Sequence, residues 1–387
     1  MKIVVLGAGQ LARMMSLAGA PLDLNVVAYD VRSARMVHPL TQEVFPWDLA
    51  QAIEKADVIT AEFEHIPDPV LEACSPSGKF CPGTTAIKTG GDRRLEKTLL
   101  DKLAIPCAPY QLITAQEHLN QGINQLGLPL VIKTCQAGYD GKGQWRLTAD
   151  SDRDQLWSQM QAFLASGSVD TPRTIIAEKM IPFQREVSVI GARDRSGKVA
   201  IYPVTENHHT NGVLTLSIAK KEAKKEAVDI QAQAEAAFFK LTSAMDYVGV
   251  LAIEFFDVQG KLMVNEIAPR VHNSGHWTQQ GTLCSQFENH LRAVAGLPLG
   301  TTRMLGPSAM VNVLGETFIP TGVLMTPGVT SHWYGKACRP GRKMGHINIV
   351  AENEKALGEK LIAIAQYLPE ESYPGVARHG QYLVEGV

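Results

Sequence analysis

The chain has 387 residues, of which 45% are hydrophobic and 20% are charged, a composition typical of a globular protein with two or three domains. Its 37 basic and 39 acidic side chains nearly cancel, and no apolar run is as long as a membrane span, so nothing indicates a nucleic-acid or membrane partner. Six scattered cysteines without a Cys-x-x-Cys pair predict a reduced, cytoplasmic chain and argue against a zinc site. The first ten residues predict a strand and a glycine turn, not a signal peptide.

The first ninety residues predict a doubly wound α/β unit. A strand at 2–6 leads into a Gly-x-Gly-x-x-Ala turn and a helix, and a second strand follows at 25–29. This spacing fits an NAD-binding fingerprint, and it fits a tight strand-to-helix turn equally well. A third strand at 57–62 leads to Glu64. Because ligands of open α/β sheets bind beyond the carboxyl ends of the strands, Glu64 is a site candidate.

A phosphate-binding element is predicted after the first domain. Prolines and glycines in 66–91 predict a domain boundary, and 92–103 predicts a helix capped by its leading aspartate. A strand at 128–133 then brings Lys133 to the start of a glycine-rich segment, 138–144. Backbone N–H groups of such a segment can surround phosphate oxygens, and Lys133 adds a positive charge. A polar hairpin turn is the alternative.

The next strands carry candidate nucleotide contacts. A strand at 174–177 leads into Glu178 and a proline-terminated linker whose backbone groups suit a purine edge. Glu178 can accept from an exocyclic amine, and Glu186 can hold ribose hydroxyls, although solvent-exposed acids are the alternative. Two histidines, the second being His209, are expected in a polar turn, where the absence of a third ligand argues against zinc. The charged helix expected at 220–245 predicts a solvated face.

Residues 250–267 predict a β-hairpin with two convergent carboxylates. Strands at 250–256 and 261–267 flank a Gln-Gly turn. With a three-residue loop, Glu254 lies opposite Glu266 on the same face. Opposed like charges on a half-buried face need a cation between them, and a carboxylate pair suits one or two Mg²⁺ ions. An exposed face with both acids in water is the alternative.

Two further polar segments follow the hairpin. The stretch 269–277, PRVHNSGHW, concentrates hydrogen-bond donors and predicts anion or substrate recognition. A helix at 287–295, a linker and a strand at 308–314 come next. The segment 332–343 carries four cations around a Pro-Gly turn, which suits a phosphate monoester or, equally, a solvated basic loop.

The order of these features resembles the ATP-grasp ligases from about residue 92 to residue 297. The strings GQLARMM, GYDGKGQW, EVSVIGAR, APRVHNSGHWTQ and RPGRKMGHINI extend the resemblance over nearly the whole chain, to the N5-carboxyaminoimidazole ribonucleotide synthetases of purine biosynthesis. The resemblance implies a three-part α/β architecture. Its parts are a doubly wound, Rossmann-like N-terminal domain at 1–91, an ATP-grasp domain with both subdomains at 92–297 and a small C-terminal domain at 298–387.

The resemblance also implies a reaction. ATP phosphorylates bicarbonate to carboxyphosphate, which carboxylates the exocyclic amine of 5-aminoimidazole ribonucleotide, with release of ADP and phosphate. The implied cofactor is Mg²⁺, without NAD, zinc or biotin, and the implied protein is a cytoplasmic homodimer with no nucleic-acid or membrane partner. The N-terminal domain then helps to hold the acceptor substrate and does not bind NAD.

Residue roles follow from the same resemblance. The implied ATP contacts are Arg93, Lys133, Gly138, Tyr139, Asp140, Gly141, Lys142, Gly143, Gln144, Glu178, Lys179, Met180, Ile181, Glu186, His209, Asn265 and Glu266. The implied Mg²⁺ ligands are Glu254 and Glu266. The implied ribonucleotide and bicarbonate contacts are Glu64, Tyr139, Arg270, His272, Asn273, Ser274, Lys336, Arg339, Arg342 and Lys343, and the implied catalytic residues are Arg270, Lys142, His272 and Asn273.

Two departures and three rival functions accompany this interpretation. Ala268 stands where many ATP-grasp enzymes carry a metal-binding asparagine, and the glycine-rich segment lacks a glycine that relatives show at its start. A formate-using glycinamide ribonucleotide transformylase is the nearest rival. An NAD-dependent oxidoreductase would use the first glycine turn but leaves Lys133 and the hairpin acids unexplained. A non-catalytic nucleotide-binding protein would be expected to lack a magnesium acid, and both acids are present.

Overall fold

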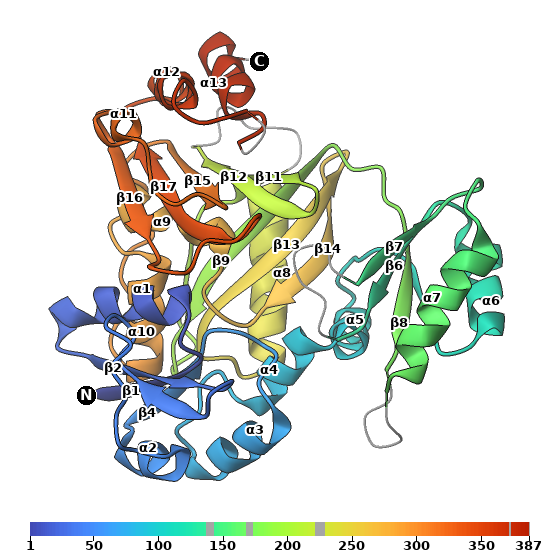
Figure 1. Ribbon diagram of the computed structural model, residues 1–387, viewed down its shortest axis with the longest axis horizontal. Coiled ribbons are helices and arrows are strands. Elements are labelled where there is room, and N and C mark those ends of the chain that lie inside the picture. Colours follow the sequence, from blue (N-terminus) through green and yellow to red (C-terminus); the bar gives the residue numbers. More distant parts are fainter. Residues whose placement is uncertain (137–142, 168–172, 221–228, 371–372, 387) are drawn as a thin grey trace.

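The computed structural model describes residues 1–136, 143–167, 173–220, 229–370 and 373–386. Within these ranges the strands form three sheets, two of four strands and one of nine. The N-terminal sheet lies at the lower left of Figure 1, the second four-stranded sheet projects to the right, and the nine-stranded sheet runs through the centre toward the C-terminal helices.

The N-terminal sheet has the order β3-β2-β1-β4, with β1 parallel to both β2 and β4. Its strands are β1 (Lys2–Leu6), β2 (Asn25–Asp30), β3 (Arg35–Val37) and β4 (Val58–Ala61). Its helices are α1 (Gln10–Gly19), α2 (Leu49–Lys55) and α3 (Asp68–Cys74). All four residues of β4 are buried, as expected for a parallel sheet covered on both faces. The predicted doubly wound opening is confirmed.

Helices α4 (Thr84–Gly91) and α5 (Arg93–Lys102) lead from this sheet to the second one. Asp92 caps α5 by accepting the N–H of Arg94, as predicted. The second sheet is antiparallel, with the order β5-β8-β6-β7. Its elements are β5 (Tyr110–Ile113), α6 (Gln116–Leu126), β6 (Leu130–Thr134), β7 (Gln144–Leu147), α7 (Arg153–Ala165) and β8 (Ile175–Lys179). Both helices cover one face around a core that includes Ile132 and Met160.

The long sheet has the order β14-β13-β9-β11-β12-β15-β17-β16, and β10 pairs with β9. Its strands are β9 (Arg185–Arg193), β10 (Val199–Ile201), β11 (Thr205–Thr210), β12 (Val213–Ala219), β13 (Gly249–Val258), β14 (Lys261–Ala268), β15 (Ser308–Leu314), β16 (Val329–Trp333) and β17 (Lys343–Val350). The accompanying helices are α8 (Ile230–Ala244), α9 (Thr278–Gly281), α10 (Gln286–Ala295), α11 (Thr321–Leu324), α12 (Glu354–Ala365) and α13 (Val376–Glu385). Because β12 pairs with β15, the sheet continues past residue 297 into the C-terminal part.

Two local expectations are corrected. His208 and His209 lie on strand β11 and not in a polar turn, because this segment pairs with β12 and β9. The helix expected from residue 220 begins at Ile230, and residues 221–228 of that expectation lie outside the described part of the chain. None of the helices in the described ranges is both long and apolar enough to cross a membrane.

Candidate active site

The β13–β14 hairpin places two carboxylates opposite each other. Glu254 pairs with Glu266, as predicted, but not for the predicted reason. The turn contains only Gln259 and Gly260, both with positive φ, and such a two-residue turn alone would shift Glu254 by one position from Glu266. A bulge at Asn265 inserts one residue into β14 and restores the pairing.

The two hairpin acids have different electrostatic surroundings. Burial and the facing charge of Glu266 raise the pKa of Glu254. Burial acts in the same direction on Glu266, but Arg93, whose guanidinium lies 2.9 Å from its Oε2, together with Lys133 and Arg270 outweighs burial and lowers the pKa of Glu266. A divalent cation between the acids would favour the charged form of Glu254, and carboxylate oxygens suit Mg²⁺. Among the described residues no group of three His, Cys, Asp or Glu side chains is placed to hold a metal.

Helix α5 directs three charged side chains into this region. Arg93 contacts Glu266, Glu96 accepts a backbone N–H of β14 over 2.9 Å, and Lys97 lies 2.9 Å from a Glu178 oxygen. Burial raises the pKa of Glu96 to about 7, against the opposing effect of Lys97. Sequence reasoning missed Glu96 and Lys97, because charges three or four residues apart on a helix ordinarily belong to a solvated face. Here both residues are at most 2% exposed.

Lys133 lies at the end of β6 and contacts Glu178 on the neighbouring strand β8. The Lys133 Nζ donates to Glu178 over 2.6 Å and to the side chain of Asn265 over 3.4 Å. Burial opposes the charged form of Glu178, but Lys133, Lys97 and Arg93 outweigh it and hold the pKa of Glu178 well below its usual range. Both Glu178 oxygens therefore face lysines, and this side chain serves first as their counter-charge.

The linker expected to bind a purine follows directly. The N–H of Lys179 donates to the carbonyl of Pro109 over 2.9 Å, and the N–H of Met180 donates to the carbonyl of Pro129 over 3.1 Å. The side chains of Lys179 and Met180 are exposed, and Ile181 is half-buried. The linker is thus anchored to the second sheet through its first two N–H groups.

Only part of the expected glycine-rich segment is described. Gly138, Tyr139, Asp140, Gly141 and Lys142 lie outside the described residues. Gly143 has φ +70°, and its carbonyl accepts the N–H of Thr134 over 2.9 Å. Gln144 begins β7 and pairs with Lys133, which places the end of this segment beside the lysine.

The two adjacent histidines on β11 have different environments. His209 lies 2.8 Å from Glu186 on β9. Burial would lower the pKa of His209, but the hydrogen bond with Glu186 and the charge of Glu254 outweigh it and raise the pKa. The ring of His208 instead lies against that of His379 of α13, with 3.7 Å between the ring centroids and the rings tilted by 33°. His209 therefore joins the acid cluster, whereas His208 contacts the C-terminal helix.

Arg270, just after β14, joins the hairpin to the N-terminal sheet. Its Nε and Nη2 donate to the two oxygens of Glu64 over 2.5 and 3.1 Å. Burial opposes the charged form of Glu64, but Arg270 outweighs it and lowers the pKa of this carboxyl. Glu64 was expected at the carboxyl end of its strand, and the bidentate pair brings it to the candidate site.

The residues after Arg270 complete this side of the site. His272 Nδ1 lies 2.9 Å from the hydroxyl of Ser274 and 3.8 Å from Glu254. Burial, with neighbouring cations, lowers the pKa of His272 well below its usual range. Asn273 forms two hydrogen bonds, of 3.0 and 2.6 Å, with Asn312 on β15. Sequence reasoning missed Asn312, because it stands within a largely apolar strand.

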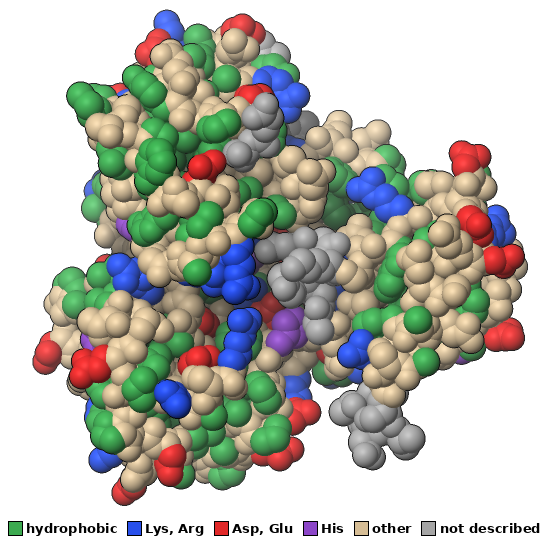
Figure 2. Space-filling view, viewed as in Figure 1, with side chains coloured by type: hydrophobic (Ala, Val, Ile, Leu, Met, Phe, Trp, Pro, Cys, Tyr) green, Lys and Arg blue, Asp and Glu red, His purple; other side chains and the backbone are tan. Residues whose placement is uncertain are grey.

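The basic segment before β17 divides into two groups. Lys336 donates to the side chain of Gln10 at the start of α1 and to the carbonyl of Lys343. Lys343 is close enough to the acid cluster for its charge to lower the pKa of Glu254, against the larger effect of burial. Arg339 is exposed, and Arg342 donates to a carbonyl of its own loop over 2.8 Å. Lys and Arg side chains gather at a hollow between the N-terminal and C-terminal parts (Figure 2).

The glycine turn that fitted a dinucleotide fingerprint holds a carboxylate of the chain itself. Gly9 and Ala12 donate their N–H groups to the two oxygens of Glu62, the latter over 2.8 Å. Phosphates bind such turns through the same N–H groups. The structure therefore favours the strand-to-helix turn over the NAD interpretation.

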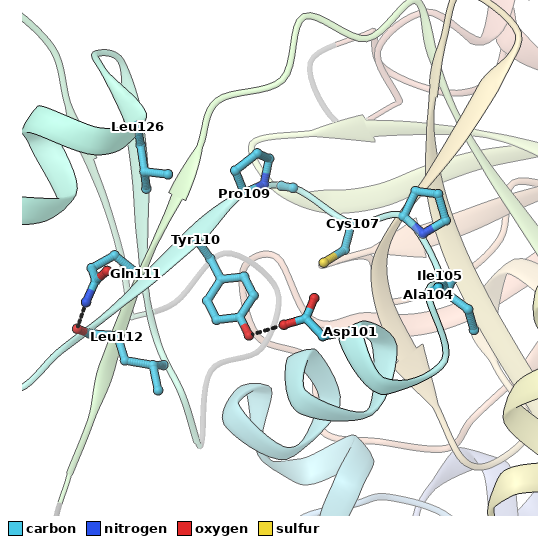
Figure 3. A pocket seen from close by; sticks show the side chains of 11 residues that line it. Asp101, Ala104, Ile105, Cys107, Pro109, Tyr110, Gln111, Leu112 and Leu126 are labelled. Atoms are coloured by element: carbon cyan, nitrogen blue, oxygen red, sulfur yellow. Dashed lines mark hydrogen bonds between the residues drawn. The ribbon is translucent and has the colours of Figure 1, made fainter.

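A groove of about 830 Å³ lies along the linker between α5 and β5 (Figure 3). Asp101 and Tyr110 meet across it through a hydrogen bond of 2.7 Å. None of the predicted site residues within the described ranges lines it. The charges of Lys97 and Glu178 both affect the pKa of Cys107, which lines this groove. The groove therefore lies near the lysine–glutamate cluster.

Comparisons with known proteins agree with this geometry. The chain matches the ribonucleotide synthetase preATP-grasp domain over residues 1–90, the ATP-grasp domain over 98–287 and the phosphoribosylaminoimidazole carboxylase C-terminal domain over 308–360. An N5-carboxyaminoimidazole ribonucleotide synthase from Vibrio cholerae is 54% identical over 376 residues, covering 97% of this chain and 98% of that protein. The Escherichia coli enzyme of the same name is 37% identical and covers 97% of both chains.

Solved structures agree as well. The crystal structure of N5-carboxyaminoimidazole ribonucleotide synthetase from Thermus thermophilus has a TM-score of 0.80 and 38% identity, covering 94% of this chain and 98% of that one. The Aspergillus clavatus synthase, solved with ADP and 5-aminoimidazole ribonucleotide, has a TM-score of 0.78 and 29% identity, covering 94% and 98%. The predicted ATP-grasp architecture is thereby confirmed. This chain belongs to the N5-carboxyaminoimidazole ribonucleotide synthase family, ATP-grasp ligases of purine biosynthesis that form a carbon–nitrogen bond.

Proposed function

We propose that this chain carboxylates 5-aminoimidazole ribonucleotide with bicarbonate, using ATP and Mg²⁺ and releasing ADP and phosphate. The observation that carries the proposal is the meeting of three groups from distant parts of the chain. The hairpin acids, the Lys133–Glu178 pair and the Arg270–Glu64 pair interact through shared neighbours, Arg93 and Glu266 among them.

The proposed chemistry has two steps. A bicarbonate oxygen attacks the γ-phosphorus of ATP, the bond to ADP breaks, and carboxyphosphate forms. The amine nitrogen of the ribonucleotide then attacks the carbon of carboxyphosphate, the bond from that carbon to the phosphate oxygen breaks, and the amine loses a proton. The protein contributes positioning, charge neutralisation and the exclusion of water from a labile anhydride.

Nucleotide binding is assigned to the second sheet and the hairpin. Lys133, Arg93 and the segment 138–144 would hold phosphates, residues 178–181 would hold the purine, and Glu186 with His209 would hold the ribose. Bound Mg²⁺ would neutralise phosphate charge, and Glu254 and Glu266 would be its protein ligands. Lys133 would exchange its contact with Glu178 for a phosphate oxygen. Its side chain is 14% exposed, so the ammonium can reach a bound nucleotide.

Acceptor binding is assigned to the opposite side. Arg270, next to Glu64, would hold bicarbonate and then carboxyphosphate, because a guanidinium binds planar oxyanions through two N–H groups. His272, with its lowered pKa, is neutral at pH 7 and can accept a proton or a hydrogen bond. Asn273 and Ser274 would orient the amine. Lys336 and Lys343, with Arg339 and Arg342 further out, would hold the ribonucleotide phosphate. The family resemblance also assigns Tyr139, Asp140 and Lys142 to the ribonucleotide and bicarbonate, and these three residues lie outside the described part of the chain.

The test is ADP release from ATP and Mg²⁺ in degassed buffer, with each remaining substrate omitted in turn. We expect release to require 5-aminoimidazole ribonucleotide and to rise with added bicarbonate. A response to formate and glycinamide ribonucleotide instead would change the substrates and keep the fold. Silence under both conditions would overturn the proposal. The proposal places this activity in the cytoplasm, in a homodimer, and light scattering of the active protein tests the dimer.

A further inference from the structure

The carboxylate of Glu62 occupies the N-terminal end of helix α1. Glu62 follows β4, is 8% exposed, and accepts the N–H groups of Gly9 and Ala12 on its two oxygens. Burial raises the pKa of Glu62, whereas these two N–H groups and the charges of Lys336 and Arg270 act to lower it. The N-cap residue Gly9 has no side chain to cap the helix, so a residue more than fifty positions away supplies the cap.

The turn is shaped around this carboxylate. A Cβ at Gly7, where φ is +117°, would lie 2.3 Å from the Glu62 side chain, and a Cβ at Gly9 would lie 2.8 Å from its oxygen. A local Ser or Asp cap at position 9 would therefore displace the Glu62 carboxylate. A local cap would stabilise α1 equally well, but it would not tie the first turn of α1 to the end of β4.

This connection between α1 and β4 matters because Gln10, at the start of α1, and Glu64, just after β4, each contact a cation of the candidate site. Gln10 begins α1, and its Oε1 accepts from Lys336. Two residues after Glu62, Glu64 holds Arg270. The end of β4 therefore fixes two cations, one directly through Glu64 and the other through Glu62, the α1 turn and Gln10.

We propose that Glu62 is a positioning residue for the acceptor substrate, holding the first turn of α1 so that Gln10 directs the Lys336 ammonium into the hollow. The inference rests on the proposed role of Lys336 toward the ribonucleotide phosphate. Glu62 touches no substrate in this account. It acts on Lys336 through the α1 turn and Gln10, in addition to the attraction between its charge and that of Lys336. Its removal affects the affinity for the ribonucleotide more than the affinity for ATP.

The experiment is a double-mutant cycle of Glu62→Gln and Gln10→Ala, with steady-state kinetics for each substrate. The side-chain amide introduced by Glu62→Gln has a single oxygen and cannot accept both backbone N–H groups on separate oxygens. We expect each single variant to raise the KM for 5-aminoimidazole ribonucleotide by about tenfold, with the KM for ATP changed less than about twofold. Because the position of Lys336 depends on both Glu62 and Gln10, the effects of the two substitutions on this KM should be less than additive. Asp57→Asn is the matched control, since Asp57 accepts the N–H of Lys2 beside the other end of β4 and should leave both KM values unchanged.

Several outcomes would overturn the inference. These are an unchanged KM for the ribonucleotide, equal rises for both substrates, or additive effects in the cycle. If Glu62→Gln does not fold, Gln10→Ala, at a half-buried helix start, still tests the last link of the path. A crystal structure of Glu62→Gln tests the geometry without activity: Lys336 should leave Gln10, and an unmoved Lys336 refutes the inference. Wild-type protein that never responds to the ribonucleotide would instead count against the proposed function.

Discussion

Lys133 and Glu178 form an ion pair between strands β6 and β8, with 2.6 Å from Nζ to Oε2. The other Glu178 oxygen lies 2.9 Å from Lys97, so one carboxylate balances two ammonium groups. The two lysines differ in access to solvent, because the side chain of Lys133 is 14% exposed and that of Lys97 is 1% exposed. Lys133 can therefore turn toward an anionic substrate, whereas Lys97 depends on Glu178 for its charge balance.

Replacing Glu178 should destabilise the protein through Lys97. Glu178→Gln removes the counter-charge of a buried ammonium, and we expect the free energy of unfolding to fall by about 3–5 kcal/mol in urea denaturation. Adding Lys97→Met should recover most of this loss, because the fully buried ammonium is then removed together with its counter-charge, whereas the side chain of Lys133 is 14% exposed and reaches solvent. A double variant as unstable as Glu178→Gln would contradict this account.

Glu266→Gln should abolish turnover without unfolding the protein. The variant keeps the shape of the side chain but removes the charge that we assign to Mg²⁺, so activity should fall below about a tenth of wild type. ADP release and circular dichroism measure the two properties. Glu288→Gln is the control, because Glu288 forms an ion pair with Arg292 within α10. If Glu266→Gln kept more than about a tenth of wild-type activity, Glu266 would not be a metal ligand.

Two glycine substitutions should act in opposite directions. Gly7→Ala places a Cβ 2.3 Å from Glu62 at φ +117°, and we expect a loss of about 2–3 kcal/mol in unfolding free energy. Gly122→Ala lies within α6, where the added Cβ would meet Gln111 at an ordinary 3.4 Å. It should stabilise by about 0.5–1 kcal/mol, because alanine favours helix. Urea titrations of both variants measure the change in unfolding free energy. A change in the same direction in both variants would refute the prediction.

His290 should make the protein sensitive to acid. Its Nδ1 accepts the N–H of Val250, its Nε2 contacts Thr60, and burial lowers its pKa to about 4. The unfolded chain has a pKa of about 6.5 at this residue and takes up the proton first as pH falls. The contribution of neutral His290 to the free energy of unfolding is therefore complete above about pH 6.5 and is lost as the pH falls toward 4. The loss amounts to about 2 kcal/mol at pH 5.

The measurement is the difference in unfolding free energy between pH 7 and pH 5. His290→Gln should show a smaller difference than wild type, and His118→Gln, at a surface position on α6, should match wild type. An unchanged difference in His290→Gln would show that other groups carry the acid sensitivity.

Local patterns in the sequence predicted much of the fold and several site residues. The cap of α5 by Asp92 spans two residues, and the placement of Lys133 at the end of β6 needs only the strand itself. The pairing of Glu254 with Glu266 was correctly expected, but from a three-residue loop that the chain does not form. The residue roles came from the family resemblance, which carries information that periodicity does not.

What the sequence determined by itself is what depends on neighbours within a few positions: alternation along strands, helix caps, turns and the order of the family motifs. The tertiary structure decided the rest. It chose which charged helix face is buried, so that Lys97 reaches Glu178, and it brought Arg270 to Glu64 across 206 positions and Lys336 to Gln10 across 326. Such pairings depend on how whole sheets pack, because the residues near a side chain in the sequence do not specify which distant strand end will lie beside it.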